Sequence, residues 1–227
     1  MIKAVFFDLD NTLLDFVKMK SEAVKNALNA MVESGLNIDP EASFKKIQSI
    51  YEKEGWEHQE VFNKFIENEI GFVDNKHLAA GIVAYRRAKE ANLKPYPGVR
   101  KTLHQLMKMG IKLAIVTDAP SREAWMRIHQ MNLHHIFDEV ITLDESGERK
   151  PSSKPFEIAL QNLGLTKDEA IMIGDWPERD IAGANSVGIK SVYARYGSMF
   201  DIDNSGANWD ADNINELVNI IKSINEN

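Results

Sequence analysis

The chain has 227 residues, of which 44% are hydrophobic, and its 27 basic and 34 acidic side chains give a net charge of −7. This length and apolar content suffice to bury a substantial core in one large or two smaller domains. With a negative balance and no basic tract, we expect no nucleic-acid partner. The chain contains no cysteine. Disulfides, thiolate nucleophiles and thiolate metal sites are therefore excluded, and any metal must be held by oxygen or histidine ligands.

The opening apolar run has no signal-peptide pattern, and no later run is long enough to cross a bilayer. We therefore expect a cytoplasmic protein with no membrane partner. The sequence does not indicate an oligomeric state.

Two acids come after the first apolar run of the chain. Residues 4–7 (AVFF) have the character of a buried strand, and residues 8–12 (DLDNT) come directly after it. Residues i and i+2 on extended backbone point to the same side, so Asp8 and Asp10 would face one small volume and repel each other unless a cation or a proton relieves them. An isolated acid pair often only caps a turn, so its interpretation depends on whether polar partners stand at the ends of the later strands.

The pattern of hydrophobic residues changes after Leu14 and again near Pro95. Four amphipathic helical patterns occupy the intervening segment, without a convincing strand. Strands then alternate with helices, which is typical of a doubly wound parallel sheet. We predict an α/β fold: a Rossmann-like core of residues 1–14 and 93–227, with an all-helical cap domain inserted over residues 15–92. Within the core, Thr166 and Glu169 match a capping box, and Gly164 and Gly188 stand where helices should stop.

Polar groups also stand at the ends of the later predicted strands. Residues 111–116 end in Thr117-Asp118, which offer a hydroxyl and backbone N–H groups suited to a phosphate. A polar, proline-containing loop over residues 148–155 carries Lys150 and precedes a helix that should start near Phe156. Residues 170–174 form another buried strand, followed by 175–180 (DWPERD). Because sites in open α/β sheets form outside the carboxyl ends of the strands, these groups should meet there.

Taken in order, DLDNT at 8–12, Thr117, Lys150-Pro151 and Gly174-Asp175 through Asp180 resemble the motifs of the haloacid dehalogenase superfamily of hydrolases. The likeness spans nearly the whole chain. Many relatives have a second proline two residues after the lysine-proline pair, where this chain has Ser153. Arg149 and Lys154 also lie in this loop, and we assign Lys150 as the cation that enters the site. Residues 174–180 are further similar to an archaeal branch that includes triose-phosphate phosphatases.

This resemblance implies a Mg²⁺-dependent phosphatase that hydrolyses a small phosphomonoester. Asp8 would be the nucleophile that forms an aspartyl-phosphate, and Asp10 the general acid and then base, with its pKa raised by neighbouring acids. Leu9, Thr117, Asp118 and Lys150 would bind the phosphate. The metal would be held by Asp8, the backbone carbonyl of Asp10 and Asp175, with Asp180 in support. The inserted helices would cover Asp8 and choose the leaving group.

Three other interpretations stay open. A phosphomutase shares both aspartates and differs only in keeping the intermediate from water. A dehalogenase needs no leaving-group acid, and in the dehalogenating relatives the position of Asp10 is not Asp. A noncatalytic module would be expected to have lost site residues, which this chain retains. Trp176, Trp56, His58 and Lys18 have no assigned role, and we interpret His134-His135 as loop residues.

Overall fold

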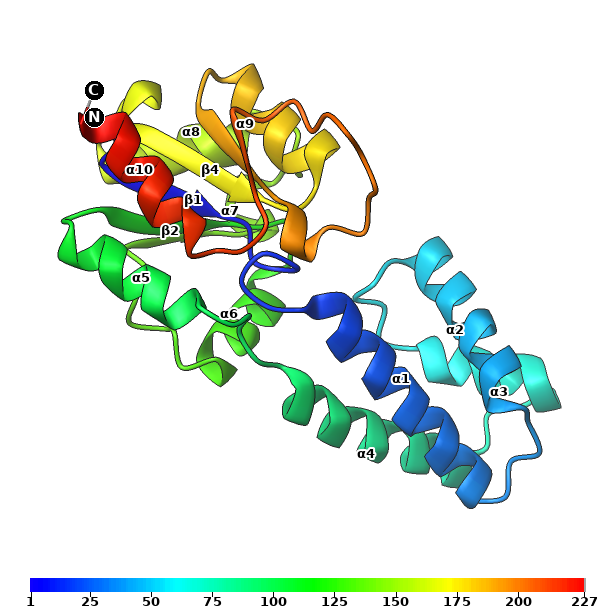
Figure 1. Ribbon diagram of the computed structural model, residues 1–227. Helices are drawn as coiled ribbons and strands as arrows, with labels where there is room; N and C mark the ends of the chain where they lie inside the picture. The colour runs from blue at the N-terminus through cyan, green and yellow to red at the C-terminus, as the bar shows by residue number, and fades with distance from the viewer. Residues whose placement is uncertain (227) are drawn as a thin grey trace. The chain divides into compact units, whose positions relative to one another are not determined.

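The computed structural model describes residues 1–226, which divide into two compact units (Figure 1). One unit contains the chain up to Asp15 together with the residues from Lys94 onward, and the other is Phe16–Leu93. These bounds lie within one residue of the predicted domain boundaries. The role of the helical unit as a cap stays a prediction.

Six parallel strands form a single sheet in the first unit. They are β1 (Ala4–Phe7), β2 (Lys112–Val116), β3 (Glu139–Ile141), β4 (Ala170–Gly174), β5 (Lys190–Ala194) and β6 (Trp209–Ala211). Their order across the sheet is β3-β2-β1-β4-β5-β6. β2 and β3 therefore lie on one side of β1, and β4, β5 and β6 lie on the other. The order of the strands reverses between β1 and β4, so the carboxyl ends of these two strands form the topological switch point.

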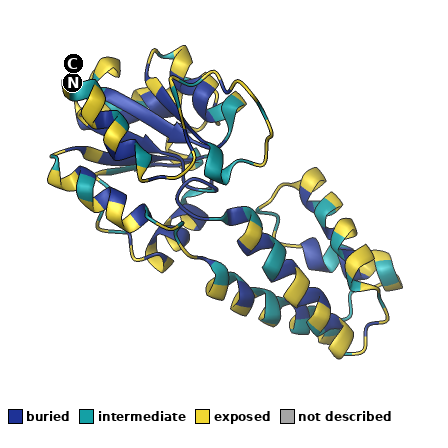
Figure 2. Cartoon of the chain, viewed as in Figure 1, coloured by how far each residue is buried: buried dark blue, intermediate teal, exposed yellow. Residues whose placement is uncertain are grey.

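Helices cover both faces of this sheet (Figure 1). They are α5 (Val99–Lys108), α6 (Ser121–Gln130), α7 (Leu143–Ser146), α8 (Lys154–Leu163), α9 (Ala182–Ser186) and α10 (Glu216–Glu226). Coverage on two faces explains why β1 and β4 are buried at every position, as their continuous apolar runs suggest. Phe6 and Met172 share one hydrophobic cluster with Phe156 and Ala159 of α8. Figure 2 shows the central strands as buried.

The predicted helix signals of this unit are confirmed, with one shift. Gly164 ends α8 in the left-handed conformation, and Thr166 and Glu169 form a capping box on a 3₁₀ turn over Lys167–Glu169. The start of α8 lies at Lys154 rather than near Phe156. Pro155 falls in the first turn of the helix, where its missing N–H is harmless and its fixed φ suits the helix, so the helix begins before the proline and not after it.

Four helices make up the second unit: α1 (Phe16–Glu33), α2 (Pro40–Glu54), α3 (Val61–Ile70) and α4 (Asn75–Asn92). Their apolar faces enclose a separate hydrophobic core. A buried cation lies beside this core. The Nζ of Lys20 donates to the carbonyl oxygen of Trp56 at 2.7 Å and stands 4.4 Å from the centre of the Tyr51 ring. Trp56 itself is 41% exposed and stacks on Tyr51.

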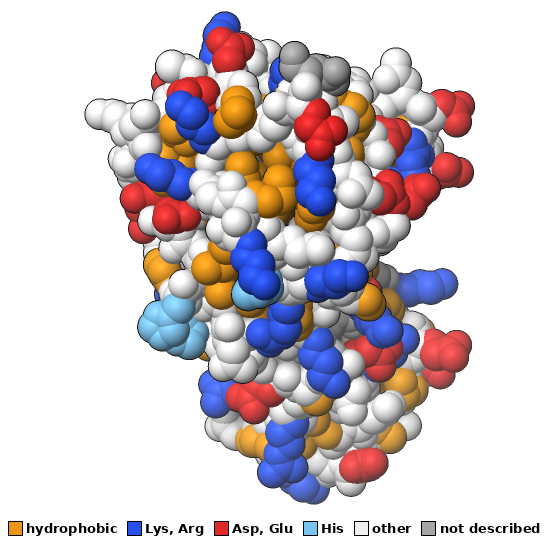
Figure 3. Space-filling model, turned by 60° about the vertical axis from the view of Figure 1, so that its left-hand side comes forward, with side chains coloured by type: hydrophobic (Ala, Val, Ile, Leu, Met, Phe, Trp, Pro, Cys, Tyr) orange, Lys and Arg blue, Asp and Glu red, His pale blue; other side chains and the backbone are white. Residues whose placement is uncertain are grey.

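Acidic, basic and hydrophobic side chains all occur on the face of the molecule in Figure 3. Such a mixture is usual for an exposed protein surface. Among residues 1–226, no helix is both long and apolar enough to cross a membrane.

Candidate active site

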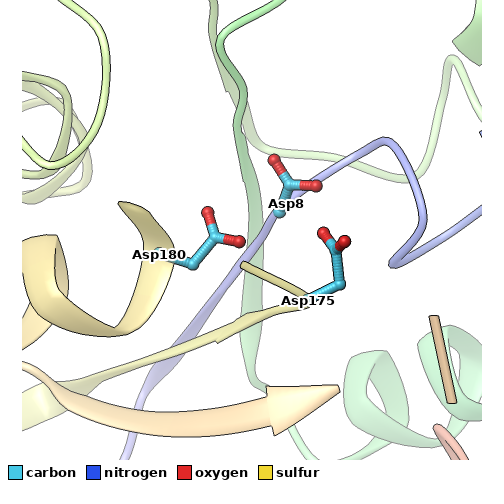
Figure 4. Close-up of side chains that lie close together, drawn as sticks. All are labelled: Asp8, Asp175 and Asp180. Carbon is cyan, nitrogen blue, oxygen red and sulfur yellow. The ribbon is translucent and has the colours of Figure 1, made fainter. Parts of the chain in front are cut away.

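Three buried carboxylates meet at the carboxyl ends of β1 and β4. Asp8 follows β1, and Asp175 and Asp180 belong to the segment that follows β4. Each offers an oxygen that lies within 4.8 Å of the others, and Figure 4 shows the three side chains converging. Within residues 1–226, this is the one group of three or more acid, histidine or cysteine side chains that comes so close.

A glycine at the end of β4 makes room for this cluster. A Cβ at Gly174 would lie 2.3 Å from Cγ of Asp180, which is too short for a contact between carbon atoms that are not bonded to each other. Asp180 sits in a π-helical turn over Pro177–Ile181, and its Oδ2 accepts a hydrogen bond from the backbone N–H of Trp176 at 3.0 Å. Gly174 therefore lets the turn fold back until Asp180 stands beside Asp8.

Lys150 supplies the positive charge of the site. Its Nζ donates to Oδ1 of Asp8 at 2.5 Å, to Oδ1 of Asp180 at 2.6 Å and to the carbonyl oxygen of Val116 at 2.9 Å. The three N–H donors of an ammonium are thereby all used. The backbone N–H of Lys150 also donates to Asp118 at 2.9 Å. Of the cations in this loop, Lys150 is the buried one that enters the cluster, as the sequence predicts.

Burial and crowding perturb the titration of the cluster. Burial, with the charges of Asp180 and Asp175, holds the pKa of Asp8 well above its usual value, although Lys150 acts in the opposite sense. Burial and the charge of Asp180 likewise raise the pKa of Asp175 to about 8. For Lys150, burial alone would lower the pKa, but Asp180 and Asp8 reverse that effect and raise it. The cluster thus holds excess negative charge that a cation would relieve.

Asp10 does not join this cluster. Its Oδ2 instead accepts a hydrogen bond from Nη1 of Arg127, on α6, at 2.8 Å. Asp10 is thus outside the close group of ligand atoms, and the expectation that its side chain faces the same volume as Asp8 stays a prediction. The rule for residues i and i+2 holds on extended backbone, but β1 ends at Phe7 and the chain bends beyond it, with Asn11 in the left-handed region at φ 57°.

The loop that carries Asp10 is held by residues that follow β5. The hydroxyl of Tyr196, just after β5, donates to the carbonyl oxygen of Thr12 at 2.9 Å, and burial raises the pKa of this tyrosine well above its usual value, so it stays a donor. A Cβ at Gly197 would lie 1.5 Å from the carbonyl oxygen of Asn11. Only glycine permits so close an approach of two backbones.

The predicted phosphate-binding residues lie at the same edge of the sheet. Thr117 follows β2 directly, and its Oγ1 accepts a hydrogen bond from the backbone N–H of Ala119 at 3.2 Å. The carboxylate of Asp118 binds the backbone of Lys150 and lies 3.6 Å from Arg179. Leu9 is fully buried, so its side chain packs in the core, and its role in binding phosphate through the backbone stays a prediction.

Two aromatic groups that the sequence leaves without a role lie in this unit. Trp176 stacks under the guanidinium of Arg179 at 3.8 Å and makes an edge contact with Phe200. The turn after α6 holds His134, whose ring stacks on that of His129 at 4.3 Å. His134 and His135 lie in a turn outside the helices and strands, as their interpretation as loop residues predicts.

The donor set at the acid cluster fits Mg²⁺. This ion prefers carboxylate and carbonyl oxygens, and three buried carboxylates supply them within one small volume. The two oxygens of Asp180 also accept hydrogen bonds from Lys150 and Trp176, which suits a supporting position better than a leading one. Asp8 and Asp175 are the principal candidates as ligands.

Arg127 is the residue of the site that sequence reasoning missed. It is 1% exposed and is the largest fully buried side chain among the described residues. A charged residue in a short amphipathic helix is usually solvated, and nothing near Arg127 in the sequence resembles a motif. The one available signal is its position on the buried face of α6, between Ala124 and Ile128.

Comparison with known proteins identifies the family to which the chain belongs. The model of the haloacid dehalogenase-like hydrolase family matches residues 5–194, and the chain belongs to this family. The predicted resemblance, the α/β fold class and the assignment as a hydrolase are thereby confirmed.

Two curated relatives and one solved structure have more specific names. The chain is similar to proteins named glyceraldehyde 3-phosphate phosphatase from Methanopyrus kandleri, at 36% identity, and from Methanocaldococcus jannaschii, at 33% identity, with 99% of each chain covered in both cases. Among solved structures, it is similar to a HAD phosphatase from Thermococcus onnurineus, with a TM-score of 0.71 and 25% identity over 97% of this chain and 98% of that one.

Proposed function

We propose that the protein is a Mg²⁺-dependent phosphatase that hydrolyses a small phosphomonoester through an aspartyl-phosphate on Asp8. The observation that carries this proposal is the hydrogen bond from the Nζ of Lys150 to Oδ1 of Asp8, at 2.5 Å, within a buried acid cluster. The names of its relatives favour a three-carbon sugar phosphate, glyceraldehyde 3-phosphate, as the substrate.

Under this proposal the two oxygens of Asp8 have different tasks. Oδ1 accepts a hydrogen bond from Lys150, which supports Oδ2 as the atom that attacks phosphorus. As the new O–P bond forms, the bond from phosphorus to the ester oxygen breaks and Asp10 gives that oxygen a proton. Water then attacks the phosphorus while Asp10 takes one of its protons, and inorganic phosphate leaves with Asp8 restored.

The other residues of the site would bind the metal ion and the phosphate group. Asp8, the carbonyl oxygen of Asp10 and Asp175, supported by Asp180, would hold Mg²⁺, which when bound neutralises the approach of a phosphate dianion to a carboxylate. The hydroxyl of Thr117 and the backbone N–H groups of Leu9 and Asp118 would bind the phosphoryl oxygens, and Lys150 would offset their charge.

A phosphate-release assay over small phosphorylated metabolites tests this proposal. Wild-type protein with Mg²⁺ should release inorganic phosphate from glyceraldehyde 3-phosphate in an amount equal to the substrate consumed. Asp8→Asn should lose roughly 10³-fold or more in kcat while it stays folded, because an amide is similar in size but cannot attack phosphorus.

The same substitution at Asp39 is a matched control. Asp39 caps α2, far from the acid cluster in the sequence, and asparagine caps a helix equally well, so Asp39→Asn should keep full activity. Substantial turnover by Asp8→Asn would contradict the covalent mechanism. An isomeric sugar phosphate as the product, instead of inorganic phosphate, would show a phosphomutase.

A further inference from the structure

A fully buried arginine reaches across the first unit to the proposed general acid. Arg127 lies on α6, and its Nη1 donates to Oδ2 of Asp10 at 2.8 Å. The two residues are 117 positions apart in the sequence. Burying a guanidinium is costly unless a carboxylate compensates it, so a fold that retains this pair must gain something from it.

The pair is not needed to hold the backbone around Asp10. That backbone is already fixed by the hydroxyl of Tyr196 on the carbonyl of Thr12, and by the N–H of Tyr96 on the carbonyl of Leu13 at 2.9 Å. Gly197 packs directly against the carbonyl of Asn11. These contacts set the course of the chain but leave the side-chain torsions of Asp10 undetermined.

We propose that Arg127 is a positioning residue that orients the carboxyl group of Asp10 for proton transfer. A carboxyl group is planar, so a hydrogen bond to Oδ2 also fixes the direction of Oδ1. Arg127 thus presents Oδ1 of Asp10 as the oxygen that exchanges a proton with the leaving group. This inference rests on the proposed function, in which Asp10 is the acid.

Leaving-group dependence separates this role from a merely structural one. An alkyl phosphate such as glyceraldehyde 3-phosphate needs a proton on its departing oxygen, whereas p-nitrophenyl phosphate does not. The ratio kcat/KM reports only the steps up to release of the leaving group, so the later hydrolysis of the aspartyl-phosphate does not affect it. A misplaced acid should therefore lower kcat/KM for the alkyl ester alone.

Arg127→Met, which keeps the length of the apolar stem, should lower kcat/KM for the alkyl ester by about 10- to 100-fold, while the aryl ester changes by less than about threefold. In an Asp10→Asn background, adding Arg127→Met should change the alkyl value by no more than about twofold, because the group that Arg127 orients is already disabled. Equal losses for the two esters, or a full loss in the Asp10→Asn background, would overturn the proposal.

Arg127→Lys covers the case in which Arg127→Met does not fold. Lysine keeps the charge and one donor but lacks the planar fork, so it should restore part of the alkyl activity and fall between wild type and Asp10→Asn. A loss by Arg127→Lys that is equal for both esters would contradict the positioning role.

The matched control is Arg100→Met. Arg100, on α5, donates to the carbonyl oxygen of Met131 at the end of α6. Its removal loosens the same helix without touching Asp10, so the ratio of alkyl to aryl activity should not change. The proposed function and the role of Arg127 can fail separately. The proposed function is contradicted if Asp10→Asn lowers the activity on both esters equally. The role of Arg127 is contradicted if Asp10→Asn affects the alkyl ester selectively and Arg127→Met does not.

Discussion

Lys150 connects three neighbouring strands through one atom. Its acceptors are Asp8 after β1, Asp180 after β4, and the carbonyl oxygen of Val116 in β2. Removing one partner of a buried charge pair leaves the other charge uncompensated and typically costs about 3–5 kcal/mol. The lysine therefore contributes to the integrity of the core as well as to the chemistry proposed for it.

A substitution at Gly174 tests whether activity requires Asp180 to stand close to Asp8. In Gly174→Ala the new methyl group would meet Cγ of Asp180, which is held by Lys150 and by the N–H of Trp176. We expect the turn to shift, with a loss of stability of about 1–3 kcal/mol and a large loss of phosphatase activity.

Gly164→Ala is the control for this substitution. Gly164 has φ +65° and nothing near its missing Cβ, so alanine there should cost about 1 kcal/mol of stability through backbone strain alone. Chemical denaturation and the phosphate-release assay measure the two effects. Equal activity of the two variants would show that the position of Asp180 is unimportant.

At the scale of secondary structure, the sequence predicts the elements that frame the site. The fully buried runs of β1 and β4 identify the strands to the residue, because strands in a parallel sheet are apolar on both faces. The directions of the side chains beyond the strand ends could not be predicted. The chain leaves extended backbone after Phe7, and Arg127, the partner of Asp10, belongs to a helix that no local pattern connects with it.

The capping box before β4 contains a carboxylate whose ionisation makes the stability of the protein depend on pH. Glu169 accepts hydrogen bonds from Thr166 and lies 2.5 Å from the Nζ of Lys3. The hydrogen bond to Lys3, followed by those from Thr166, lowers the pKa of Glu169 to about 2 from a usual value of 4.5. The native state thus favours the ionised form, and the stabilisation is present above pH 4.5 and is lost as the pH falls toward 2.

Thermal unfolding of wild type and Glu169→Gln should show this directly. Glutamine can still accept the hydrogen bonds from Thr166 but loses the charge, so the variant should have the lower Tm at pH 7 and the two curves should converge below pH 4.5. Lys3→Met should remove most of the difference. A gap in Tm that stays constant from pH 7 to pH 3 would contradict the assignment.

For the whole molecule, we expect Mg²⁺ to act as a stabilising ligand. A cation that binds the native acid cluster and not the unfolded chain raises stability, by about 2.7 kcal/mol at 100 times its Kd. The Tm should therefore rise with Mg²⁺ concentration and return on addition of a chelator. Asp175→Asn removes a principal ligand and should abolish most of the shift.

Asp39→Asn again serves as the control, because it leaves the cluster intact and should respond to Mg²⁺ as wild type does. A protein whose Tm is insensitive to Mg²⁺ would contradict the proposed metal site. This measurement does not require a substrate, so it stands apart from the activity assays.

The central place of β1 has a consequence for synthesis of the chain. Both of its neighbours are made later, since β2 ends at Val116 and β4 at Gly174. A ribosome that adds about 5–20 residues per second completes β4 roughly 10–30 s after β1. Throughout that interval four consecutive apolar residues lack a native neighbour on at least one edge. Charged residues that flank such a run oppose aggregation, and Lys3, Asp8 and Asp10 flank this one. We therefore expect the acids proposed to act in catalysis to protect the nascent strand as well, before the site exists.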